Sequence, residues 1–244
     1  MVFSLIPVMQ NYENRAWVDV IGPYDFYAYL WQHNSLLPLL LPLVAAVPFT
    51  LAFTGQLTNR YLTYTRTRQD LRALIGVRFA WNGAITFLTF FVVALMPQLF
   101  VVFGQKSYDT AGYGLNTPAE IEAARLHSLT FGQLLAYGSW APIVAYAAYV
   151  GLTAALYAAL SMCSVLVFPN RVLGLTLPWI AFVLASFGMA VLWLEAYSVA
   201  LVFPFGLQQL PLWHLAVPMA GLFVVTVAAV LVVVLRAPKL AQLQ

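Results

Sequence analysis

The stretch WAPIVAYAAYVGLTAALYAALSMCSVLVF, residues 140–168, contains no charged side chain. A helix needs ~20 apolar residues to cross the hydrocarbon core of a bilayer, so this stretch is long enough to span one. The apolar run already starts at residue 131, and a helix over all of 131–168 would reach ~57 Å, against a core of ~30 Å. We therefore expect FGQLLAYGS, residues 131–139, to be an interfacial helix or a turn that leads into the span. Pro142 should then open the span or kink it.

Four further runs are apolar on all sides, as in helices that face lipid or the interior of a bundle. They cover about 36–55, 79–103, 172–194 and 212–235. The whole chain is 63% hydrophobic and only 8% charged, against roughly 25% charged residues in soluble domains. The sequence therefore predicts an all-α integral membrane protein with about five transmembrane helices.

The basic residues predict how the chain crosses the membrane. If the loop 56–78 is cytoplasmic and the spans alternate, eight basic residues fall inside and three outside. The eight are Arg60, Arg66, Arg68, Arg72, Arg78, Arg171, Arg236 and Lys239. The net charge of +3 thus reflects topology and does not indicate nucleic-acid binding. We predict a transmembrane domain over 36–235, an extracytoplasmic loop over 104–130 and a cytoplasmic tail over 236–244.

This orientation leaves residues 1–35 as an extracytoplasmic N-terminal segment. No secretory signal peptide is visible, because MVFSLIPVM lacks a basic n-region and a small-residue cleavage site. We expect VFSLIPVM, residues 2–9, to be the tail of a first span that is missing from this chain. A translocated N-terminus is the alternative.

Two of the predicted outer segments have a character of their own. TPAEIEAARLHSL, residues 117–129, is typical of a short helix, with Thr117 as N-cap, Pro118 at the first helical position and Glu120 completing a capping box. AYSVALVFPFGLQQLP, residues 196–211, is too short and broken to cross a membrane but too apolar for a simple wet loop. It predicts a re-entrant or interfacial element before the last span.

The motifs of several enzyme classes are missing from the sequence. There is no GxxxxGK[ST], HExxH or GxSxG, and the three histidines are scattered, so neither a nucleotide site nor a metal site is expected. Cys163 is the single cysteine and cannot form a disulfide within the chain. Glu195 is the only acid close to the interior of a span, which makes it a candidate intramembrane polar site. The other interpretation is an interfacial glutamate with access to water, beside Trp193 and Trp213 as aromatic anchors.

The stretch RYLTYTRTRQDLRALIGVR, residues 60–78, holds five of the eleven basic residues. An apolar stripe at helical spacing, with Arg68 in its middle, predicts an amphipathic cytoplasmic helix or a pair of turns here. The stripe consists of Leu57, Tyr61, Tyr64, Leu71 and Ile75. Its charge has three explanations from the residues alone: membrane topology, a helix resting on anionic lipid, or a docking surface for a cytoplasmic partner.

Two parts of the chain resemble the type-2 ABC exporter permeases, in particular a bacterial branch of that family. The first is LLPLLLPLVAAVPFTLAFTGQLTNRYLTYTRTRQDLRALIGVRFAWNGAITFL, residues 36–88. The second is LYAALSMCSVLVFPNRVLGLTLPWIAFVLASF, residues 156–187, with an Asn170–Arg171 turn and Pro178 near the start of the next span. The resemblance covers about residues 36–235.

The resemblance implies a permease with six spans and both ends in the cytoplasm, of which the five spans here match the second to the sixth. It implies that the loop 56–78 carries the coupling helix that touches a separate ATPase subunit. The coupling residues would be Arg60, Tyr64, Arg66, Arg68, Asp70 and Arg72. The chain departs from the family in lacking the first span and in having Asn59 where the family often has Glu.

The function implied is the permease subunit of an ATP-driven exporter in a bacterial plasma membrane. Its partners would be a second permease chain, membrane lipid and a cytoplasmic ATPase dimer. That dimer would bind ATP and Mg²⁺, so this chain would need no cofactor and would not itself be an enzyme. An alternative of another class is a non-transporting anchoring or assembly subunit of a larger membrane complex, which the missing first span favours. A third, an intramembrane enzyme, is disfavoured by the lack of paired polar catalytic residues.

Overall fold

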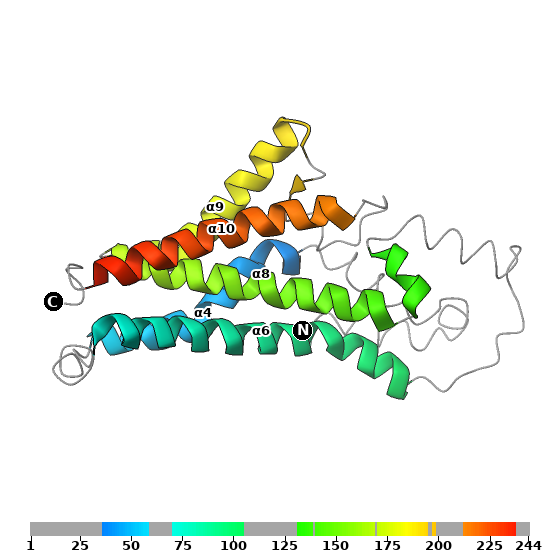
Figure 1. The fold of residues 1–244 in the computed structure, drawn as a ribbon, viewed down its shortest axis with the longest axis horizontal. Coiled ribbons are helices and arrows are strands. Elements are labelled where there is room, and N and C mark those ends of the chain that lie inside the picture. Colours follow the sequence, from blue (N-terminus) through cyan, green and yellow to red (C-terminus); the bar gives the residue numbers. More distant parts are fainter. Residues whose placement is uncertain are drawn as a thin grey trace, which may run out of the picture.

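The structure is a computed structural model of the chain. It describes residues 36–58, 70–104, 131–138, 140–168, 170–194, 197–198 and 212–237. In these ranges the chain forms helices and turns, without a strand (Figure 1). The α-helices are α4 (Leu36–Thr58), α6 (Leu71–Gly104), α8 (Trp140–Val167), α9 (Arg171–Val191) and α10 (Leu212–Arg236), and a 3₁₀ helix, η1, covers Gly132–Tyr137.

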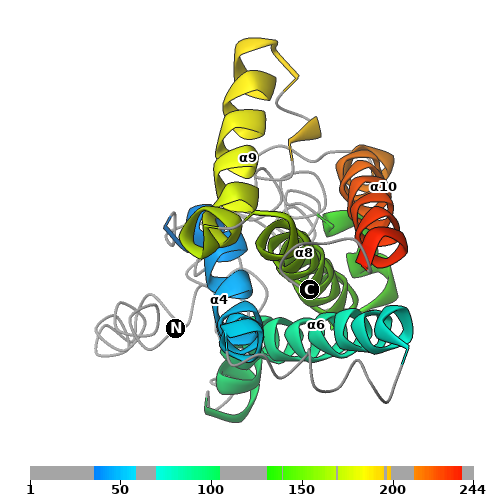
Figure 2. The ribbon, with the colours of Figure 1, turned by 90° about the vertical axis from the view of Figure 1, so that its left-hand side faces the viewer.

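Helix α8 forms the centre of the bundle, and the other four α-helices pack around it (Figure 2). In its most apolar window 72% of the residues are buried, against 22% in α6 and 17% in each of α9 and α10. A helix that is apolar on all sides is stable where protein or lipid covers every face. Protein covers α8, whereas most residues in the apolar windows of α6, α9 and α10 are not buried.

Four helices are long and apolar enough to cross a membrane: Leu71–Met96, Trp140–Val167, Arg171–Val191 and Trp213–Arg236. The prediction of an all-helical protein with long apolar helices is therefore confirmed in the described part of the chain. Helix α4 coincides with the remaining predicted span, 36–55, but its apolar stretch, Leu39–Pro48, is shorter. A fifth span therefore stays a prediction.

The lead into α8 has the form that the sequence predicts. Helix η1 precedes α8, and Gly138 between them has a φ of 108°, in the left-handed region that glycine adopts without steric cost. Helix α8 then begins at Trp140, which puts Pro142 in its first turn. There the missing N–H of proline removes no hydrogen bond of the helix, so Pro142 opens the span.

The two apolar clusters of the core give the direction of four of the helices. The first, called here the Val150 cluster, consists of Leu41, Ala45, Phe90, Ala94, Phe131, Ile143, Tyr146, Ala147, Val150, Ala154 and Leu215. The second, called the Leu166 cluster, consists of Phe53, Leu71, Ile75, Phe79, Met162, Cys163, Leu166, Val233 and Ala237. Helices α4, α8 and α10 therefore run from the Val150 cluster to the Leu166 cluster, and α6 runs back, as expected for alternating spans.

The turn between α8 and α9 depends on Asn170. Its Oδ1 accepts hydrogen bonds from the backbone N–H of Val172 at 3.1 Å and of Leu173 at 3.3 Å. These are two of the N–H groups that a helix start leaves without intrahelical partners. The side chain thereby fixes the point where α9 begins, one residue after the predicted Asn-Arg turn starts.

We expect Asn170→Ala to lower the free energy of unfolding by about 1 kcal/mol, because both N–H groups lose their acceptor. The measurement is unfolding of the purified protein in mixed detergent by added SDS, followed by circular dichroism. Asn170→Asp keeps the capping oxygen and serves as the control. An equal loss in both variants would mean that the cap does not stabilise α9.

Candidate functional site

The predicted coupling residues are only partly within the described ranges. Arg60, Tyr64, Arg66 and Arg68 lie outside them, as do Glu195, the predicted short helix 117–129 and almost all of 196–211. Asp70 and Arg72 are described, and both are exposed. The structure also assigns Leu71–Arg78 to the first turns of α6, so the end of the predicted loop 56–78 belongs to a long membrane-type helix.

Asp70 caps this helix. Its Oδ1 accepts a hydrogen bond from the Arg72 N–H at 3.2 Å, and its carbonyl oxygen accepts one from the Leu74 N–H at 3.0 Å. Aspartate is favoured here because its carboxylate pairs with free N–H groups and lies at the positive end of the helix dipole. Asp70 therefore has a structural role as the N-cap of α6. The sequence also carries this signal, because an aspartate just before an apolar periodic run is typical of a helix start.

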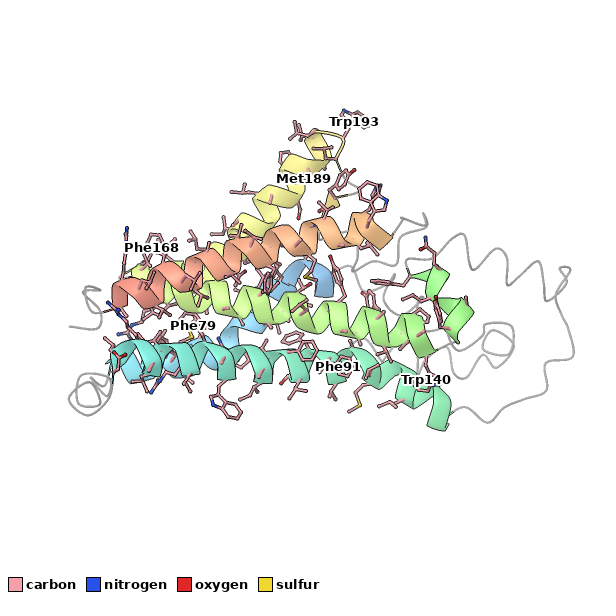
Figure 3. The ribbon with its side chains drawn as sticks, viewed as in Figure 1. Phe79, Phe91, Trp140, Phe168, Met189 and Trp193 are labelled. Atoms are coloured by element: carbon pink, nitrogen blue, oxygen red, sulfur yellow. The ribbon has the colours of Figure 1, made fainter. Side chains whose placement is uncertain are left out.

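All charged residues in the described ranges lie at one end of the bundle, called here the basic end. They are Asp70, Arg72, Arg78, Arg171 and Arg236. The first three belong to the start of α6, Arg171 begins α9 and Arg236 ends α10. Phe79 and Phe168 mark this end in Figure 3, and Trp140 marks the other end. Helices α4, α8 and α10 end at the basic end, and α6 and α9 begin there.

Arg78 lies two turns inside α6 and contacts α4. Its guanidinium carbon is 5.7 Å from the centre of the Phe53 ring, which belongs to the Leu166 cluster. An arginine over an aromatic face is attracted by the electrons of the ring, most strongly where water is excluded. The contact joins the first turns of α6 to α4.

A second polar feature lies inside the bundle, between the two apolar clusters. It consists of four side chains, Thr50, Asn82, Thr86 and Ser161, which we call the polar layer. None of them exposes more than 5% of its surface. On each helix they fall between members of the two clusters: Thr50 between Ala45 and Phe53, Asn82 and Thr86 between Phe79 and Phe90, and Ser161 between Ala154 and Met162.

Asn82 joins α6 to α8 within the polar layer. Its Nδ2 donates to the carbonyl oxygen of Ala158 at 3.5 Å and to Sδ of Met162 at 3.8 Å, and Thr86 Oγ1 donates to Asn82 Oδ1 at 3.4 Å. The two bonds between nitrogen or oxygen atoms are long, since N–H···O bonds are most often about 2.9–3.0 Å and O–H···O bonds about 2.7–2.8 Å. Polar side chains in a membrane bundle usually bond across helices in this way. The predicted site residues do not include Asn82, although an asparagine inside an apolar run indicates a buried polar contact.

An aromatic group lies at the end opposite the basic end. The Tyr197 ring centre is 6.2 Å from that of Trp213 and 5.0 Å from that of His214. Trp193 at the tip of α9 is 91% exposed (Figure 3), and Trp213 is also exposed. Exposed tryptophans at a helix end suit the interfacial anchors that the sequence predicts. Within the described ranges, no three His, Cys, Asp or Glu side chains come together to hold a metal ion.

No family model matches the chain, and neither a curated protein nor a solved structure matches it. The functional conclusion therefore rests on the arrangement of helices, charges and buried polar groups.

Proposed function

We propose that this chain is the permease subunit of an ATP-driven exporter of the type-2 ABC class. The observation that carries the proposal is the basic end, where every charged residue of the described ranges gathers. Helix α4 ends and α6 begins at this end, and the residues between them in the sequence include Arg60, Arg66 and Arg68. A separate ATPase dimer, which binds ATP and Mg²⁺, would dock there. The proposal includes five spans, a cytoplasmic C-terminus and a bacterial plasma membrane.

The central position of α8 bears on where a transport path would lie. Because α8 fills the middle of the bundle, a path through the centre of one chain has no room. A path between two permease chains remains, with facing helices of both chains as its walls. The proposal therefore includes a second permease chain, of the same or another sequence.

The test is co-purification with the ATPase encoded beside this chain. We expect wild type to retain it and Arg66/Arg68/Arg72→Glu to lose it, because the reversed charges repel the surface that the arginines attract. Arg171/Arg236/Lys239→Glu is the matched control, since it makes the same change of charge at basic residues of the other predicted cytoplasmic segments. We expect this control to keep the ATPase.

Two results would count against the proposal, at different levels. Equal retention by wild type and Arg66/Arg68/Arg72→Glu would exclude the α4–α6 segment as the docking surface. No ATPase with any variant would count against the exporter itself. The filled centre of the single chain would then favour the second candidate, a non-transporting anchoring or assembly subunit, whose other membrane components should be recovered in the same purification.

A further inference from the structure

Hydroxyl groups in this bundle generally bond to their own helix. Six serine and threonine side chains donate to a carbonyl oxygen three or four residues before them, at 2.7–2.9 Å. They are Thr54, Thr89, Thr153, Ser164, Thr176 and Thr226. In this way a hydroxyl in an apolar helix obtains a hydrogen bond without a partner on another helix.

The hydroxyls of Thr50 and Ser161 depart from this pattern. Both residues are completely buried, and neither Oγ1 of Thr50 nor Oγ of Ser161 has a hydrogen-bond partner among the described residues. Leaving a hydroxyl unpaired in an apolar interior costs free energy, and a lipid bilayer offers no water from outside to relieve the cost. Both hydroxyls belong to the polar layer, so the two exceptions occur at one level of the bundle.

The geometry of α8 shows where Ser161 points. Ala158 faces α6, because its carbonyl accepts from Asn82, and Tyr157 faces α9, because its ring meets Phe182 edge-on at 5.6 Å. On a helix of 3.6 residues per turn, position 161 lies between the directions of positions 157 and 158. Helix α4 occupies the position between α6 and α9 around α8 (Figure 2). Ser161 therefore faces α4, the helix that carries Thr50.

We propose that the polar layer binds water between α4, α6 and α8. A buried water needs two to four polar partners. The hydroxyls of Thr50 and Ser161 supply two, and both can donate and accept. The Asn82 amide, whose present bonds are long, supplies a third. This site does not depend on the transport function proposed above.

The sign of a stability change tests the site. Without water, Ser161→Ala and Thr50→Val each remove an unsatisfied hydroxyl and raise the SDS concentration at the unfolding midpoint. With shared water, each variant lowers the midpoint, and the double variant loses less than the sum of the two. Thr153→Val is the matched control, since its buried hydroxyl bonds within α8. We expect Ser161→Ala and Thr50→Val to fall below this control; a rise in both would overturn the proposal.

A second measurement uses a thiol as the probe. Ser161→Cys in a Cys163→Ala background puts a thiol in the polar layer, whereas native Cys163 lies two residues away in the apolar Leu166 cluster. The S–H infrared band reports exchange of the thiol proton in D₂O. We expect exchange at least about tenfold faster at position 161, because water at the site removes the need for local opening. Exchange no faster than at Cys163 would overturn the proposal.

Discussion

Gly151→Val should lower the free energy of unfolding by about 2–3 kcal/mol, as overpacking of a tight interface does. A Cβ atom at this position would lie 2.9 Å from the carbonyl oxygen of Phe87 in α6, and 3.1 Å and 3.3 Å from two atoms of its ring. The oxygen is a backbone atom and cannot move without moving α6. The ring has little freedom either, because it stacks on Phe91 with centres 5.7 Å apart.

The loss at Gly151 is specific to the contact between α6 and the central helix. The measurement is SDS-induced unfolding of the purified protein, followed by circular dichroism. Gly221→Val in α10 is the matched control, because nothing lies within 4 Å of a Cβ there and valine is the better helix former. We expect no loss in the control. A similar loss in both variants would mean that glycine acts through the backbone, and that the close approach to Phe87 is not the cause.

The sequence predicts most of the helix positions, because long uncharged runs form helices in a membrane for lack of other hydrogen-bond partners. The lead-in turn before Trp140 and the turn at Asn170 follow from proline and asparagine at fixed positions. Helix α6 begins earlier than its predicted span, at Leu71. Its first turns carry Arg72 and Arg78, and these charges place the predicted start of the span at residue 79.

The central place of α8 could not be predicted from apolarity, since every predicted span is apolar on all sides. What distinguishes α8 is the set of small residues at its closest contacts, of which Gly151, Ala154 and Ala158 are completely or almost completely buried. Small residues let helix backbones approach in a membrane. Ala154 and Ala158 are four residues apart in the sequence, as in pairs of small residues at helix contacts, but such a pair does not say which helix it faces.

The polar layer could not be predicted from the sequence either. Asn82 and Ala158 are 76 residues apart, and Thr50 lies on a third helix. Only the alignment of the helices brings these side chains to one level. The predicted coupling residues are a different case: the resemblance to the permease family implies them, and Arg60, Tyr64, Arg66 and Arg68 lie outside the described ranges.

Gly174→Val should detach α9 from the rest of the bundle. A Cβ atom at this position would lie 2.8 Å from Cα and 3.0 Å from the backbone nitrogen of Val165 in α8, so the two helices would have to separate. Helix α9 has few other attachments. Its buried residues are Gly174, Pro178 and Phe182, all within its first twelve residues, and its C-terminal part projects away from the other helices (Figure 1).

Separation at Gly174 also weakens the contacts further along α9, because they are short-ranged. Phe182 meets Tyr157 edge-on, and Trp179 Nε1 donates to the Leu39 carbonyl oxygen at 3.0 Å. We expect amide hydrogen exchange in α9 peptides to become about ten- to a hundredfold faster, as local opening becomes easier, while α6 peptides change little. Gly188→Val is the control on the same helix, with nothing within 4 Å of its Cβ. Equal acceleration in both variants, or in α6 as well, would contradict a local detachment, because the effect would then arise from the helix itself or from the whole bundle.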